Sequence, residues 1–100
     1  IPILEVLKPK SHIKIKSNFL PRTEKIIEHG YHNDVLPVKE YNSKTAIYYV
    51  NTNNGYTRFS SKKIIKCEFN KLIIFDNKIK HSGSTCTDEL SKVVINFNYF

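Results

Sequence analysis

The sequence contains no methionine and no tryptophan, and it has only three glycines and two cysteines in 100 residues. Cys67 and Cys86 form no CxxC pair, so we expect neither a disulfide scaffold nor a zinc knuckle. No apolar run approaches the length of a membrane-spanning helix, and no signal peptide opens the chain, so no membrane association is expected. No long segment has a helical period. These absences indicate a reducing, cytoplasmic-type compartment and a fold with little or no helix.

Acidic residues are also scarce, since nine Asp and Glu stand against sixteen Lys and Arg and leave a net charge of +7. Nearly all of the positive charge is lysine, because Arg22 and Arg58 are the only arginines. A basic domain can bind nucleic acid or another anionic partner through long-range attraction. The lysines are scattered along the chain, however, which favours an ordinary solvated surface over a nucleic-acid interface.

The apolar residues that are present are mainly Ile, Val, Phe and Tyr, which favour β-strands. Apolar segments separated by turn residues predict strands within residues 12–19, 25–34, 45–51, 56–61, 62–76 and 92–100, with two strands and a turn near Asn70-Lys71 in the fifth of these ranges. Such short strands, with turns every eight to twelve residues, are typical of a sandwich or barrel. We therefore predict one all-β domain over residues 1–100, a double-stranded β-helix (jelly roll) of two facing sheets.

Three local features of this prediction can be compared directly with a structure. The alternation in the first strand predicts that Ile13, Ile15 and Phe19 share its buried face. Asn54-Gly55 is expected to supply a turn that tolerates positive φ. Residues 77–91 are expected to form a loop centred on Gly83.

The stretch EHGYHNDV, residues 28–35, contains three potential metal ligands. His32 and Asp34 are two residues apart and would point to the same side of a strand. His29 would point to the other side and is not expected to be a ligand. His81, beyond the apolar segment KLIIFD, is the third candidate. Two histidines and a carboxylate form the facial triad of non-haem Fe(II) oxygenases, although a zinc hydrolase could use the same ligand types.

Lys92 lies near the start of the last predicted strand and shares a strand face with Val94 and Asn96. A lysine on the apolar lining of a barrel needs an anion as its partner, and a dicarboxylate cosubstrate would supply one. Tyr48 and Tyr49 are adjacent, so one of them must face inward, where its hydroxyl could contact the same anion.

The segments HND, AIYYVNTNNGYTRF, NKLIIFDNKIKHSG and KVVINFNYF, taken in order, resemble the Fe(II)/2-oxoglutarate-dependent oxygenases of the prolyl-4-hydroxylase-like branch. The chain is most similar to the small phage and marine-microbial members, and the run NFLPRTEKIIEHGYHND shares this similarity. The resemblance covers about residues 12–100 and implies a cupin-like jelly roll in the cytoplasm of a bacterial or phage-infected cell. The first residue is Ile1 rather than Met, which is compatible with an N-terminally truncated fragment or a processed product.

The resemblance implies that His32, Asp34 and His81 bind Fe(II). It also implies that Lys92 binds the distal carboxylate of 2-oxoglutarate, where most members of the family have arginine. Lysine keeps the positive charge but not the bidentate geometry of the guanidinium. Members that halogenate lack the carboxylate ligand, and because Asp34 is present, halogenation is not expected.

Further contacts to the cosubstrate are expected from tyrosine and asparagine side chains. The resemblance implies Tyr49 as the inward tyrosine that supports the same carboxylate, with Tyr48 as the alternative if the strand register shifts by one residue. Asn18 and Asn96 are also candidates to reach the cosubstrate.

The expected function is hydroxylation of an unidentified substrate (a peptide, a nucleobase or a small metabolite), with O₂ consumed and with succinate and CO₂ as co-products. One alternative is a basic β-domain that binds nucleic acid or an anionic protein, but this alternative gives the histidines, Asp34 and Lys92 no role. A second alternative is a member of the oxygenase fold that has lost its activity.

Overall fold

The computed structural model describes residues 13–32 and 43–99, and these residues are all-β, as predicted. The strands are β1 (Ile13–Pro21), β2 (Lys44–Tyr49), β3 (Tyr56–Phe59), β4 (Ile64–Lys66), β5 (Lys71–Asp76), β6 (His81–Gly83) and β7 (Ser91–Tyr99). Within these two ranges no residue is helical, and therefore no helix there is long enough to span a membrane.

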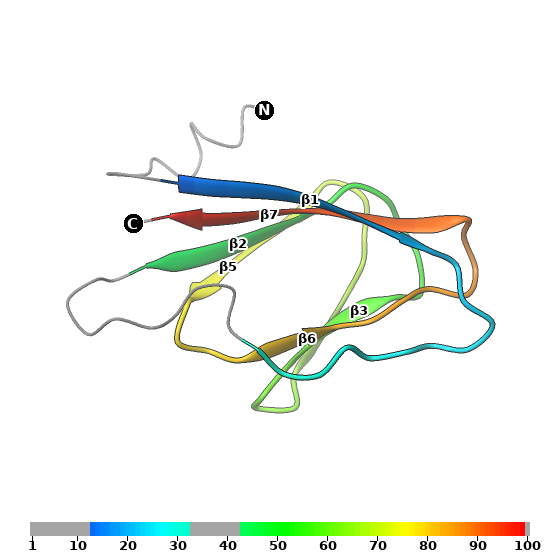
Figure 1. The fold of residues 1–100 in the computed structure, drawn as a ribbon, viewed down its shortest axis with the longest axis horizontal. Helices are drawn as coiled ribbons and strands as arrows, with labels where there is room; N and C mark the ends of the chain where they lie inside the picture. The colour runs from blue at the N-terminus through cyan, green and yellow to red at the C-terminus, as the bar shows by residue number, and fades with distance from the viewer. Residues whose placement is uncertain (1–12, 33–42, 100) are drawn as a thin grey trace.

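Two antiparallel sheets face each other (Figure 1). The larger sheet has the strand order β1-β7-β2-β5, and the smaller has the order β4-β3-β6. Residues 28–32 run beside β6 and are joined to it by two isolated bridges, Glu28 to Ser84 and His32 to His81. The chain thus passes repeatedly from one sheet to the other, which is the arrangement of the predicted double-stranded β-helix.

Strands β2 and β7 place buried side chains on both faces of the larger sheet, which fits the apolar runs at residues 46–49 and 93–95. The face toward the smaller sheet contributes to a core of Ile47, Tyr49, Cys67 and Val94, completed by Ile65, Ile73 and Phe75. The face away from the smaller sheet carries a second cluster of Ala46, Phe97 and Tyr99, completed by Tyr48, Leu72 and Ile95.

Strand β1 exposes the side chains that were expected to be buried. The side chain of Phe19 is 70% exposed, and that of Ile15 is 52% exposed. Pairing with β7 sets this orientation, because Leu20 lies opposite Lys92 and Asn18 lies opposite Val94. Directly opposed residues point to the same side of a sheet, so the inward set of β1 contains Asn18 and Leu20. The prediction therefore gave the position of this strand in the sequence correctly but assigned the wrong face of the strand to the core.

Two loop predictions also differ from the structure. The segment around Gly83 is not simply a loop, because its residues form β6, which pairs with β3. The Asn54-Gly55 turn has no positive φ, whereas the predicted turn at Asn70 does, with φ of 62°.

Gly55 is required for close packing instead. A β-carbon added there would lie 2.7 Å from Asn53 Oδ1, 3.0 Å from the Thr85 carbonyl oxygen and 3.1 Å from Lys92 Cδ. Real β-carbons do not tolerate such contacts without movement of the surrounding atoms, and one of those atoms belongs to the backbone. Glycine therefore allows the chain after β2 to approach β7 and the segment beyond β6.

Replacing this glycine should test the packing directly. Gly55→Ala should lower the free energy of unfolding by about 1–3 kcal/mol, the usual cost of an overpacked core, measured by urea denaturation. Gly83→Ala is the matched control, because its β-carbon would meet its nearest neighbour, Lys92 Nζ, at an ordinary 3.7 Å. Equal losses in the two variants would show that close packing at Gly55 is not the cause.

Candidate functional site

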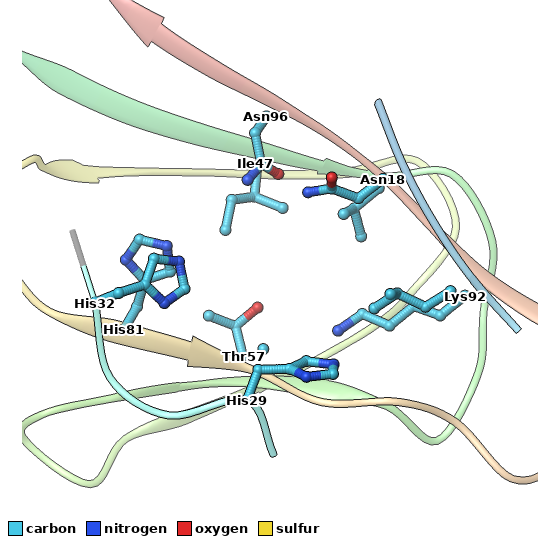
Figure 2. Close-up of a pocket in the computed structure, with 11 residues that line it drawn as sticks. Asn18, His29, His32, Ile47, Thr57, His81, Lys92 and Asn96 are labelled. Carbon is cyan, nitrogen blue, oxygen red and sulfur yellow. The ribbon is translucent and has the colours of Figure 1, made fainter. Parts of the chain in front are cut away.

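A cavity of about 270 Å³ opens between the two sheets (Figure 2). Its apolar floor includes Ile47 and Val94 of the larger sheet. Its polar lining consists of Asn18, His29, His32, Thr57, His81, Lys92 and Asn96. Five of these are site residues predicted from the sequence: Asn18, His32, His81, Lys92 and Asn96. Among the residues that the structure describes, the lining includes the ammonium of Lys92 and no carboxylate.

His32 and His81 lie side by side at one end of the cavity (Figure 2). Their ring centroids are 4.6 Å apart, with an angle of 48° between the ring planes. Paired backbone hydrogen bonds hold the two residues together: His32 N donates to the His81 carbonyl at 2.9 Å, and His81 N donates to the His32 carbonyl at 3.0 Å. The side chain of His81 is buried and that of His32 is exposed, so a ligand can approach the pair from the His32 side.

The histidine pair has donor atoms suited to a metal ion. His32 Nδ1 lies 3.2 Å from the Gly30 carbonyl oxygen. A hydrogen bond of this kind places the proton on Nδ1 and leaves the lone pair on Nε2, as is usual for a metal-binding imidazole. Asp34, the third predicted ligand, lies outside the described residues. Within the described ranges, no three His, Cys, Asp or Glu side chains are grouped so that they could hold a metal ion together.

Gly30 introduces a β-bulge into the segment beside β6. Glu28 pairs with Ser84 and His32 pairs with His81, so four steps along one strand correspond to three along the other. Gly30 has φ of +90°, a conformation that glycine adopts readily. Its amide N donates to the Ser82 hydroxyl oxygen at 3.1 Å rather than to a backbone carbonyl.

The bulge overturns the expectation for His29. Simple alternation placed this residue on the opposite face from His32, but both residues line the same cavity. The extra residue at the bulge shifts the alternation by one, so side chains three apart point to the same side. In Figure 2 the ring of His29 is turned away from the His32–His81 pair, toward the end of the cavity that holds Lys92. The sequence signal that could have predicted this was Gly30 itself.

Lys92 occupies the far end of the cavity and is 3% exposed. Its Nζ donates to the Ser84 carbonyl at 2.7 Å and to the Tyr56 carbonyl at 3.3 Å. Among the described residues, no carboxylate forms an ion pair with it. Burial lowers the pKa of Lys92, and interaction with the thiols of Cys67 and Cys86 opposes this shift. An anion in the cavity would stabilise the charged form that burial disfavours.

Tyr49 faces inward, as predicted, but it reaches the cavity through another residue. Its hydroxyl oxygen is 2.7 Å from the Thr57 hydroxyl, which lines the cavity. Burial raises the pKa of Tyr49, so the phenol stays protonated. Tyr48 points to the opposite face of the sheet, where its hydroxyl donates to Asn70 Oδ1 at 2.8 Å. The alternative register is therefore excluded, and Thr57 is a cavity-lining residue that was not among the predicted site residues.

The two asparagines bring amide groups to the larger-sheet side of the cavity (Figure 2). Asn96 Oδ1 is buried and makes no hydrogen bond to any described residue. A 180° rotation of the amide exchanges its oxygen and NH₂ positions, so the group can offer either an acceptor or a donor to a bound molecule.

No protein-family model matches the sequence, and no curated protein matches it. Among solved structures, a cupin protein from Bacteroides fragilis is similar, with a TM-score of 0.65 and 9% identity over 89% of this chain and 66% of that chain. A protein from Neisseria meningitidis has a TM-score of 0.57 and 10% identity over 88% of this chain and 74% of its own. An RmlC-like cupin protein from Desulfovibrio desulfuricans has a TM-score of 0.50 and 12% identity, over 84% and 81% respectively.

At these identities the similarity shows the fold alone. It confirms that the chain has the cupin-like double-stranded β-helix fold. The chain spans slightly less than two thirds of the length of the Bacteroides protein.

The bulge can be tested by substitution at Gly30. Gly30→Ala should destabilise the protein by about 1–2 kcal/mol, the cost of a left-handed conformation for a residue with a β-carbon. Steric overlap does not contribute, because no atom lies within 4 Å of the added β-carbon. Gly30→Asn should cost less, since asparagine tolerates positive φ. Urea denaturation measures both, and an Asn variant as unstable as the Ala variant would contradict the assigned conformation.

Proposed function

We propose that this protein is an Fe(II)- and 2-oxoglutarate-dependent oxygenase that hydroxylates a C–H bond of its substrate. The observation that carries the proposal is the buried Lys92 ammonium, which shares one cavity with the His32–His81 pair. A histidine pair alone is equally compatible with a zinc protein. A buried cation at the other end of the same cavity favours a cosubstrate with a second, distal carboxylate.

At the metal end, His32 and His81 would hold the ion together with Asp34. The exposed side of His32 provides access, and the Gly30 carbonyl orients its imidazole. When bound, Fe(II) supplies the redox chemistry by which O₂ converts 2-oxoglutarate to succinate and CO₂ and hydroxylates the substrate. The paired backbone hydrogen bonds between the two histidines keep their positions fixed before any ligand binds.

At the anion end, Lys92 would neutralise the distal carboxylate of 2-oxoglutarate. The Ser84 and Tyr56 carbonyls accept two of its hydrogen bonds, and an ammonium has three donors. Figure 2 shows the ammonium directed into the cavity, toward Thr57. The Thr57 hydroxyl, oriented by Tyr49, can donate to the same carboxylate. A cavity of about 270 Å³ suits a small dicarboxylate better than a larger ligand.

The proposed compartment is the cytoplasm. Cys67 and Cys86 are both buried free thiols. Burial raises the pKa of the Cys67 thiol to about 11, which keeps it protonated and unreactive near neutral pH. Cysteines that remain reduced favour a reducing compartment.

Removing the charge at position 92 should separate an oxygenase from other metal proteins. Lys92→Met keeps an unbranched apolar side chain but lacks the ammonium. It should weaken 2-oxoglutarate binding by roughly ten- to a hundredfold, the equivalent of about 1.5–3 kcal/mol for a hydrogen bond to a charged group. The measurement is an anaerobic titration of the Fe(II)-loaded protein that follows the metal-to-ligand charge-transfer absorption of the bound cosubstrate.

Lys66→Met is the matched control, because Lys66 is exposed on β4 and lies outside the cavity. Its 2-oxoglutarate affinity should equal that of the parent. Unchanged affinity in Lys92→Met would mean that another residue binds the distal carboxylate. The lack of any charge-transfer absorption in the parent would favour the inactive-fold or binding-domain alternatives.

Two exposed histidines of the same cavity provide a paired test of the metal end. His32→Ala should weaken Fe(II) binding by more than the roughly 10–100-fold that loss of an outer-shell partner causes. His29→Ala should leave it nearly unchanged, because His29 lies away from the histidine pair (Figure 2). Anaerobic competition with a colorimetric chelator gives both affinities. Equal losses in the two variants would contradict the proposed ligand set.

A further inference from the structure

The structure has a second cavity, of about 410 Å³. Phe75 lines this cavity and contacts His81 of the histidine pair. The cavity opens between β5 of the larger sheet and the β3–β4 hairpin of the smaller sheet. Its apolar lining consists of Phe59, Ile65, Ile73, Ile74, Phe75 and Ile79. The size lies in the range of small-molecule sites, about 300–1,000 Å³.

The lining leaves apolar surface in water. The side chain of Ile74 is 50% exposed, and that of Ile79 is 40% exposed. Exposed aliphatic groups gathered around one concave surface are stabilised when an apolar molecule covers them. The apolar part of an occupant is therefore an aliphatic chain or a comparable hydrocarbon.

Polar groups are confined to one part of the lining. Ser61 and Lys63 both belong to the connection between β3 and β4. No carboxylate lines the cavity among the described residues, and none of the ion pairs formed within those residues includes Lys63. Charge complementarity therefore favours an anionic group beside Lys63.

We infer that this second cavity binds an aliphatic carboxylate, with its chain along Ile65, Ile73 and Ile79 and its carboxylate near Lys63. The inference goes beyond the proposed oxygenase activity, because this binding needs neither a metal nor 2-oxoglutarate. The cavity is distinct from the first one, and the two share no lining residue among those described.

The first test is calorimetric titration of the metal-free protein with octanoate, decanoate and dodecanoate. Affinity should rise by roughly two- to fourfold for each added methylene, the gain expected from partial to full burial of each group. The rise should end when the chain exceeds the cavity. The absence of saturable binding by all three acids would overturn the inference.

A matched pair of isoleucine variants tests where the aliphatic chain of the ligand binds. Ile79→Ser should weaken decanoate binding by roughly three- to tenfold, because Ile79 lines the cavity. Ile64→Ser should leave it unchanged, since Ile64 is equally exposed, at 42%, but lies outside the lining. Equal losses would mean non-specific partitioning onto exposed apolar surface and would overturn the inference.

Matched lysines locate the carboxylate. Lys63→Gln should weaken decanoate binding by about two- to fivefold, as expected for an exposed ion pair. It should not affect decanol, and the difference should disappear at high salt. Lys66→Gln should change the affinity for neither decanoate nor decanol. If sedimentation instead showed a dimer that Ile79→Ser converts to a monomer, a second copy of the chain would cover the cavity and the inference would be wrong.

Discussion

The buried ammonium of Lys92 is the interaction on which the arrangement of the two sheets around the candidate site depends. Lys92 belongs to β7 of the larger sheet, and the carbonyls that accept its hydrogen bonds belong to Tyr56 of β3 in the smaller sheet and to Ser84, the residue after β6. Withdrawing an ammonium from water costs several kcal/mol, and two carbonyl dipoles offset only part of that cost. Gly55 leaves room for the aliphatic part of the lysine side chain, so the backbone packs closely around it. An anion in the cavity would offset the remaining cost of burying the ammonium.

Where the two-residue period is unbroken, the sequence pattern predicted which residues share a strand face. In β7 it placed Lys92, Val94 and Asn96 on one face, and in β2 it allowed only one of the two adjacent tyrosines to face inward. Both strands are paired on each side within the larger sheet, so their registers leave little freedom. The all-β class and the jelly roll followed from strand spacing, which depends on turn residues rather than on long-range contacts.

The features that sequence analysis missed depend on contacts between distant segments. His29 enters the cavity because Gly30 adds a residue to its strand. A glycine in a strand is a signal for a bulge, but the pairing with residues 81–84 decides that one forms there. Pairing with β7 sets which side chains of β1 face inward. The apolar character of Phe19 therefore predicted the wrong face. Thr57 gains its position from the Tyr49 hydroxyl on the facing sheet. In each case the side chain was identifiable, but its direction was not.

A row of ring contacts forms the boundary between the two cavities. Phe59 meets Phe75 edge to face at 4.9 Å, and Phe75 meets His81 in the same way at 5.0 Å. Such contacts stabilise aromatic pairs by about 0.5–1.5 kcal/mol each, and close-packed interiors leave rings little room to move independently. Phe75 lines the apolar cavity, and His81, its neighbour on the other side, lines the first cavity. The ring of the buried histidine therefore packs against a residue of the apolar cavity, while its backbone pairs with His32.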